Sequence, residues 1–125
     1  MKQTAATLFA LIAGIAIGAW GVPELRAQPA GGAYVVAEMH ITDPAGFIEY
    51  IRREPATLAP YHGRTLARAL PDVRVGAPAD GMVSLIGFAN AQDANRWLNS
   101  PEYRNLAPLQ QKSASARIYL IDGIH

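Results

Sequence analysis

The sequence predicts one small α+β domain, in which four strands form an antiparallel sheet and helices cover one face of it. Three observations support this prediction: a stretch of period-two alternation, Asp-Pro and Ser-Pro pairs typical of helix starts, and short apolar runs between turns rich in proline and glycine. The chain has 125 residues, of which 50% are hydrophobic and 17% are charged. This composition suits a folded domain and argues against intrinsic disorder.

The first 27 residues differ from the rest of the chain. Lys2 precedes an uncharged apolar run from Ala5 to Ala19, and a proline-bearing polar segment follows. This order is typical of a secretory signal, and the run spans only roughly 22 Å as a helix, against ~30 Å for the hydrocarbon core of a membrane. We expect cleavage near Ala27 and a periplasmic or secreted protein. The alternative is an uncleaved anchor from Ala5 to Val22, and only then would the protein contact a membrane.

Residues 28–32 are a linker, and residues 33–125 are the predicted folded domain. Residues 28–125 hold nine basic and nine acidic side chains, so this part of the chain has no net charge and no electrostatic case for binding nucleic acid. The absence of cysteine excludes disulfides, zinc–thiolate sites and a cysteine nucleophile. A domain of this size then needs another source of stability, and oligomerisation is the simplest.

The first predicted strand spans residues 33–42. Its odd-numbered residues from 35 to 41 are apolar and share one face, and its even-numbered residues from 34 to 40 share the other. Asp43 and Pro44 then start a helix as N-cap and first residue. Pro55 should kink or divide this helix, and Gly63 suits a left-handed cap at its end.

The second half of the domain is also predicted to consist of strands and helices joined by turns. Residues 64–70 form a second predicted strand, residues 71–81 a loop, and residues 82–88 a third strand. Asn90 and Ser100 each cap a helical segment, and the final strand spans residues 116–122. The resulting β-α-β-β-α-β order is that of the ferredoxin-like fold, a four-stranded antiparallel sheet with two helices on one face.

The other face of such a sheet carries no helices. An apolar sheet face left in water is an association site, and two such faces packed across a twofold axis close a barrel. We therefore expect a homodimer with an α/β-barrel arrangement.

Two pairs of side chains are candidates for chemistry. Glu38 and His40 share the uncovered face, where His40 could act as a base or ligate a metal or haem iron, although no second histidine is placed beside it. A polar pair at a dimer interface is the alternative. Arg64 and Arg68 lie four residues apart on the second predicted strand and are expected to share a face. They would either bind a carboxylate or another anion, or pair with acidic side chains.

Two aromatic residues of the helical segments complete the candidate set. Trp97 and Tyr103 are expected to be core or pocket-wall residues. Ser100 caps a helix and is not surrounded by a nucleophile motif. The sequence has no phosphate-binding glycine loop, dinucleotide fingerprint or zinc-protease motif, so it predicts no cofactor and no metal ion.

Several motifs resemble domain-of-unknown-function family 1330 (DUF1330), within the dimeric α/β-barrel superfamily. The resemblance covers about residues 33–123 and implies the fold and the dimer, but no activity. Superfamily relatives include small monooxygenases and haem-degrading enzymes. The sequence departs from the pattern at Gln110, where many members carry arginine, and at Val75-Gly76, where many carry a nearby glutamate. The matching segments are Tyr34-Val35-Val36, Thr42-Asp43-Pro44, Tyr50, His62-Gly63-Arg64, Ala67-Arg68, the Trp97–Tyr103 segment and Leu120–Gly123.

Two functions follow as hypotheses. The first is an exported dimeric barrel that binds a small apolar or carboxylate-bearing ligand. The second is a cofactor-independent enzyme of the monooxygenase or isomerase type, with haem binding through His40 as a weaker alternative. In the binding hypothesis the ligand would lie between the sheet and the helices. In the enzyme hypothesis Glu38, His40, Arg64 and Arg68 would orient an aromatic or enolic substrate.

Overall fold

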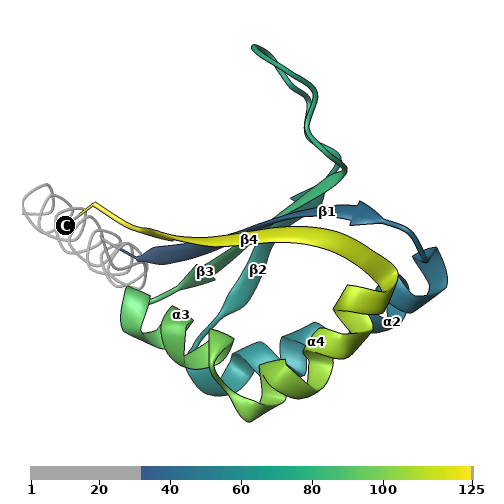
Figure 1. Cartoon of the computed structure of the whole chain (residues 1–125). Helices are drawn as coiled ribbons and strands as arrows, with labels where there is room; N and C mark the ends of the chain where they lie inside the picture. Colours follow the sequence, from purple (N-terminus) through teal and green to yellow (C-terminus); the bar gives the residue numbers. More distant parts are fainter. Residues whose placement is uncertain (1–31, 125) are drawn as a thin grey trace, which may run out of the picture.

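The computed structural model describes residues 32–124, so the predicted leader and most of the linker lie outside the described residues. Four antiparallel strands form one sheet in the order β2-β3-β1-β4. The helices all lie on one side of it (Figure 1), and none of those in residues 32–124 is long and apolar enough to cross a membrane. The elements are β1 (Ala33–Ile41), α2 (Pro44–Leu58), the 3-10 turn η1 (Ala59–Tyr61), β2 (Arg64–Ala69), β3 (Met82–Phe88), α3 (Ala91–Leu98), α4 (Pro101–Ser113) and β4 (Ala114–Asp122).

Strand β1 lies at the centre of the sheet and confirms the predicted alternation. Val35, Ala37 and Met39 are buried beneath the helices, whereas Tyr34 and His40 are exposed on the opposite face. Because successive side chains of a strand point to opposite faces, the pairing register assigns the residues of the other strands to one face or the other.

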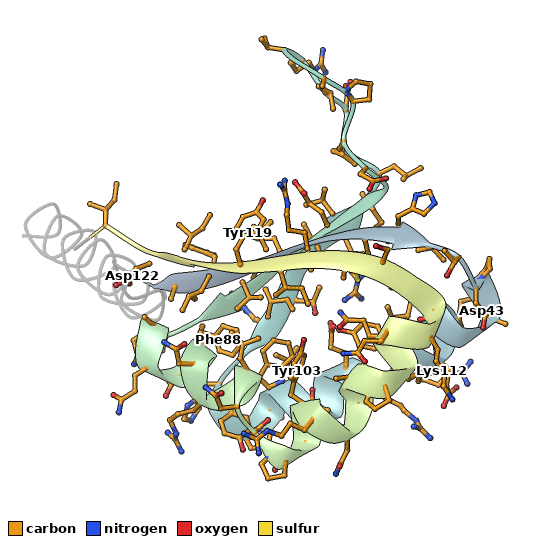
Figure 2. All side chains as sticks on the ribbon, viewed as in Figure 1. Asp43, Phe88, Tyr103, Lys112, Tyr119 and Asp122 are labelled. Carbon is orange, nitrogen blue, oxygen red and sulfur yellow. The ribbon has the colours of Figure 1, made fainter. Side chains whose placement is uncertain are left out.

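The helix-covered face holds two hydrophobic clusters. One is centred on Trp97, Phe88 and Leu58, and the other on Phe47, Met39 and Leu106. Figure 2 shows Phe88 and Tyr103 between the sheet and the helices, with Tyr119 on the far side of the sheet.

Helix α2 passes through Pro55 and ends at Leu58, so it is not divided at the proline. The left-handed residue after η1 is His62, with φ 58°, and not Gly63 as predicted. Gly63 has another role: a Cβ atom there would lie 2.5 Å from Phe88 Cε1 and 2.9 Å from Leu58 Cδ2. The glycine is therefore required by close packing and not by backbone conformation.

Two of the three predicted helix caps form their side-chain hydrogen bond. Asn90 Oδ1 accepts from the Asp93 backbone N–H at 2.8 Å, and Ser100 Oγ accepts from the Tyr103 N–H at 3.1 Å. Asp43 occupies the N-cap position of α2 but its side chain makes no capping bond.

Strand β2 contains a bulge. Thr65 pairs with Ile86 and Ala67 with Leu85, so Leu66 is an extra residue on this strand. A bulge shifts the alternation by one residue. The prediction that Arg64 and Arg68 share a face is therefore wrong: Arg64 pairs with Gly87 on the uncovered face, and Arg68 pairs with Ser84 on the helix-covered face.

Residues 70–81 connect β2 to β3 and confirm the predicted loop. We call this segment the arm, because it projects away from the body of the domain on the side of the sheet opposite the helices (Figure 1).

The uncovered face is largely apolar. Its central residues come from all four strands, and its charged groups other than Arg64 lie toward the end from which the arm leaves. The apolar members are Tyr34, Val36, Leu66, Ala67, Val83, Leu85, Tyr119 and Ile121.

Candidate functional site

The sheet separates the six predicted site residues into two groups. Arg68, Trp97 and Tyr103 lie on the helix-covered side. The other three, Glu38, His40 and Arg64, lie on the uncovered face. The six residues therefore do not form a single site within one protomer, and each side of the sheet is a separate candidate site.

On the helix-covered side, Arg68 is bound to a buried carboxylate. Arg68 Nη2 donates to Glu54 Oε1 at 2.5 Å, and Arg68 Nε donates to Ser84 Oγ at 2.9 Å. Thr65 Oγ1 also donates to Glu54 Oε1, at 2.9 Å. The Glu54 residue is 1% exposed. An ion pair this deep is held by its completed hydrogen bonds and not by charge attraction alone.

Tyr50 and Gln110 extend this polar cluster along α2 and α4. Gln110 Nε2 donates to Tyr50 Oη at 3.3 Å. Burial, the negative charge of Glu54 and a hydrogen bond to it raise the pKa of Tyr50 far above the ordinary value of 10.0. Burial and the same carboxylate also raise the pKa of Tyr103. Both phenols therefore stay protonated in the folded protein at physiological pH.

Trp97 connects the polar cluster to the hydrophobic core. Its Nε1 donates to Thr57 Oγ1 at 3.1 Å, and Thr57 Oγ1 donates to the carbonyl of Glu54 at 2.7 Å. The Trp97 and Tyr103 rings lie 4.6 Å apart between centroids. No buried side-chain polar atom of residues 32–124 lacks a hydrogen-bond partner. The cluster is thus complete without a ligand, and its arrangement is that of a structural polar core.

On the uncovered face, Glu38 is bound by a neighbouring strand. Arg117 Nε and Nη2 both contact Glu38 Oε2, at 2.9 and 2.6 Å, and the Tyr119 hydroxyl lies 3.5 Å from Glu38 Oε1. The Arg117 side chain remains 74% exposed, and its Nη1 makes no hydrogen bond to a described residue. Arg117 can therefore donate hydrogen bonds from Nη1 to a further anionic group.

His40 and Arg64 lie at opposite ends of this face. His40 Nδ1 lies 3.2 Å from Asp80 Oδ1 at the base of the arm, and both side chains are exposed. Arg64 is exposed and forms no ion pair with the described residues. In residues 32–124 no group of three His, Cys, Asp or Glu side chains is placed to hold a metal ion.

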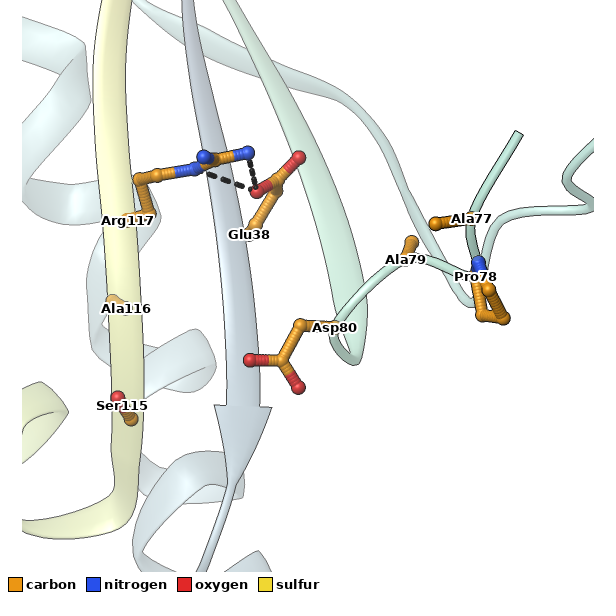
Figure 3. A pocket seen from close by; sticks show the side chains of 8 residues that line it. All are labelled: Glu38, Ala77, Pro78, Ala79, Asp80, Ser115, Ala116 and Arg117. Carbon is orange, nitrogen blue, oxygen red and sulfur yellow. Dashed lines mark hydrogen bonds and ion pairs between the residues drawn. The ribbon is translucent and has the colours of Figure 1, made fainter. Parts of the chain in front are cut away.

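A pocket of about 510 Å³ lies between the arm and the uncovered face. Its polar wall comes from β1 and β4, with Glu38, Ser115 and Arg117, and its apolar wall from Ala77–Ala79 of the arm. Asp80 projects toward it from the arm (Figure 3). The volume is within the range of small-ligand sites, roughly 300–1,000 Å³.

Sequence reasoning singled out Glu38 and His40 but missed Glu54, Asp80 and Arg117. A signal for Glu54 was available, because a charged residue seven positions after Phe47 on an apolar helical stripe requires a buried partner. No comparable signal marks Arg117, since its partner is 79 residues away in the sequence.

The fold and its two sides define an α+β protein of the ferredoxin-like class, with one sheet face open. Solved structures share this fold. SnoaB, a cofactor-independent oxygenase from Streptomyces nogalater, is 18% identical with a TM-score of 0.57, over 77% of this chain and 96% of that one. A protein of unknown function from Rhodopseudomonas palustris is 13% identical with a TM-score of 0.58, over 83% and 92%.

A dimeric ferredoxin-like protein of unknown function from Thermobifida fusca is 12% identical with a TM-score of 0.54, over 74% and 92% of the two chains. The family model described as domain of unknown function (DUF1330) matches residues 32–124. The chain therefore belongs to the DUF1330 family. No curated protein matches the sequence.

Proposed function

We propose that this DUF1330 protein is a homodimer that binds a small carboxylate-bearing molecule with a short apolar body. The dimer is supported by the apolar uncovered face and by the dimeric state of the Thermobifida fusca protein, which has the same fold. Packing two such faces together would remove them from water and enclose the pocket beside the arm.

The ligand chemistry follows from the walls of the pocket. Arg117 Nη1 makes no hydrogen bond to any of residues 32–124, and Ser115 adds a hydroxyl from the same strand. Both are donors suited to a carboxylate. Opposite them, Ala77, Pro78 and Ala79 provide an apolar wall for a short hydrocarbon or aromatic body. The observation that carries the proposal is this pocket with an exposed, partly free arginine.

The other two arginines are less suitable. Arg68 and Arg117 are each paired with a glutamate, but the Arg68–Glu54 pair is buried, where a second carboxylate would be repelled at low dielectric, whereas Arg117 is open to solvent. Arg64 forms no ion pair with residues 32–124, but it does not line the pocket. This favours Arg117 as the ligand-binding residue, with Glu38 as the group that orients it.

The test of binding is a thermal-shift titration of the purified protein with benzoate and butyrate, with benzylamine as the amine counterpart. We expect a concentration-dependent rise in melting temperature with the carboxylates. The rise should be lost in Arg117→Gln and retained in Arg104→Gln, which removes an exposed arginine of α4. Stabilisation by benzylamine alone, or an equal response of the two variants, would refute the assignment.

The test of the dimer is sedimentation velocity of the wild type and of two arginine variants. Leu85→Arg places a charge in the centre of the uncovered face, and Ile48→Arg places one on exposed α2. We expect Leu85→Arg to be a folded monomer and Ile48→Arg to remain dimeric. A monomeric wild type at micromolar concentration would refute the proposed dimer.

We also propose that the protein is exported to the periplasm or secreted, on the basis of the signal-like residues 1–27. Intact mass spectrometry of protein recovered from the producing cells tests this. A mature N-terminus near Gln28 supports cleavage. Full-length protein in the membrane fraction would instead indicate the uncleaved anchor.

Catalysis is the second candidate, favoured by the position of His40 against the pocket-lining Asp80. His40 would act as the base on a phenolic or enolic substrate that reacts with O₂. Oxygen uptake with a dihydroxynaphthalene, without added flavin or metal, tests it, and His40→Gln should abolish the uptake. A Soret band in the purified protein that disappears in His40→Gln would point to haem binding instead.

A further inference from the structure

The arm, residues 70–81, exposes apolar side chains that nothing in the described chain covers. Val75 is 93% exposed, Leu70 is 74% exposed and Val73 is 40% exposed. The same loop places charged residues beside them, with Arg74 and Asp72 paired at 2.7 Å. Three exposed apolar residues on a projecting segment cost free energy in water unless a partner covers them.

The base of the arm is fixed to the sheet. Gly81 has φ 88°, and a Cβ atom there would collide with the carbonyl oxygen of Met39 on β1. The adjacent Asp80 contacts His40 of the same strand. Pro71 and Pro78 restrict the backbone on the two sides of the arm. The direction in which the arm projects is therefore built into the fold, and little ordering is needed on binding.

The arm is long enough to pass a second sheet. Twelve residues lie between the last residue of β2 and the first of β3, and an out-and-back path of that length reaches up to about 20 Å. Two sheets packed face to face are separated by about 10 Å. The arm projects on the side of the uncovered face (Figure 1), so its tip would extend beside a second copy packed on that face.

We propose that the arm is a clasp, in which Val73 and Val75 pack against the second copy of the chain. This inference rests on the proposed face-to-face homodimer and adds a second contact to it. The two arms of a twofold dimer act reciprocally, so each protomer would be held both by its sheet and by its partner's arm. Ala77–Ala79 of the same arm form the apolar wall of the pocket, so the clasp would hold that wall in place beside the interface.

The test is sedimentation equilibrium of the wild type, of the double variant Val73→Asp/Val75→Asp, and of Ile48→Asp. Ile48 is a matched control, because it is an apolar residue of α2 that is 53% exposed on the side of the sheet away from the arm. We expect the dimer dissociation constant to rise at least tenfold in the arm variant and to stay unchanged in the control. Circular dichroism should show both variants folded.

The outcomes separate the clasp from the dimer. A monomeric wild type would refute the dimer and the clasp with it. A dimeric wild type whose dissociation constant is unchanged by the arm variant would refute the clasp alone. If the double variant does not fold, a nitroxide on Val75→Cys replaces it, since the natural chain has no cysteine. Its spectrum should broaden as the dimer forms, whereas a label on Ile48→Cys should not respond, and a mobile label at position 75 in the dimer would overturn the clasp.

Discussion

Arg64 and Arg68 lie on opposite faces of the sheet, although they are four residues apart on one strand. The bulge at Leu66 separates them, so that Arg68 enters the core beside Glu54 while Arg64 remains exposed. Arg68 thus has a structural role, whereas Arg64 forms no ion pair with residues 32–124. The two positions give a matched pair for mutation.

Arg68→Met should destabilise the protein by roughly 3–5 kcal/mol, because it leaves the buried Glu54 carboxylate without its cation. Arg64→Met should change the free energy of unfolding by less than about 0.5 kcal/mol. Urea denaturation followed by circular dichroism measures both. Adding Glu54→Leu to Arg68→Met should recover much of the loss, and equal effects of the two single variants would contradict the assigned faces.

The raised pKa of Tyr50 predicts alkaline instability. The phenol is protonated in both states below pH 10, so the folded state incurs no penalty there. Above pH 10 the unfolded chain ionises while the folded state does not, and stability falls as pH rises. The slope should reach ~1.4 kcal/mol per pH unit for each such tyrosine.

Urea midpoints measured from pH 9 to pH 11.5 test the contribution of Tyr50. Tyr50→Phe should reduce the slope, and Tyr34→Phe on the uncovered face is its control. An unchanged slope in Tyr50→Phe would show that this phenol is not the group responsible.

Gly63→Ala should destabilise the protein by about 1–3 kcal/mol, because the new methyl group would press on Phe88 and Leu58 in a packed core. His62→Gly should be neutral or stabilising, since it removes a side chain from a left-handed conformation that costs roughly 1–2 kcal/mol. Thermal melts of the two variants separate the packing role from the conformational one. A larger loss in His62→Gly would reverse the assignment.

The helix caps predict a further contrast in stability. Ser100→Ala and Asn90→Ala should each cost about 1 kcal/mol, because each removes an acceptor for a helix N–H. Asp43→Ala should cost less, because its side chain makes no capping bond. Chemical denaturation of the three variants ranks them, and a loss in Asp43→Ala equal to that in Ser100→Ala would contradict the observed geometry.

Local patterns were sufficient to predict the elements of this fold. The alternation of β1 repeats every two residues, and the caps at Asn90 and Ser100 bond backbone groups three residues away, so these features can be recognised in sequence. The element order then restricts the sheet to a few topologies. The sequence predicted the left-handed residue at Gly63, but it is His62. Gly63 is a glycine because a larger residue there would collide with Phe88 in the core, which the sequence alone does not reveal.

The sequence by itself determined the family, the order of strands and helices, and the existence of an uncovered apolar face. Only the tertiary structure decided which charges meet. Glu54 and Arg68 are 14 residues apart, and Glu38 and Arg117 are 79 apart. The contact of Glu38 with Arg117 depends on strand register, and that of Glu54 with Arg68 depends on the bulge at Leu66. These features are set by the packing of the whole domain, because the shift of one residue in a strand moves a side chain to the opposite face.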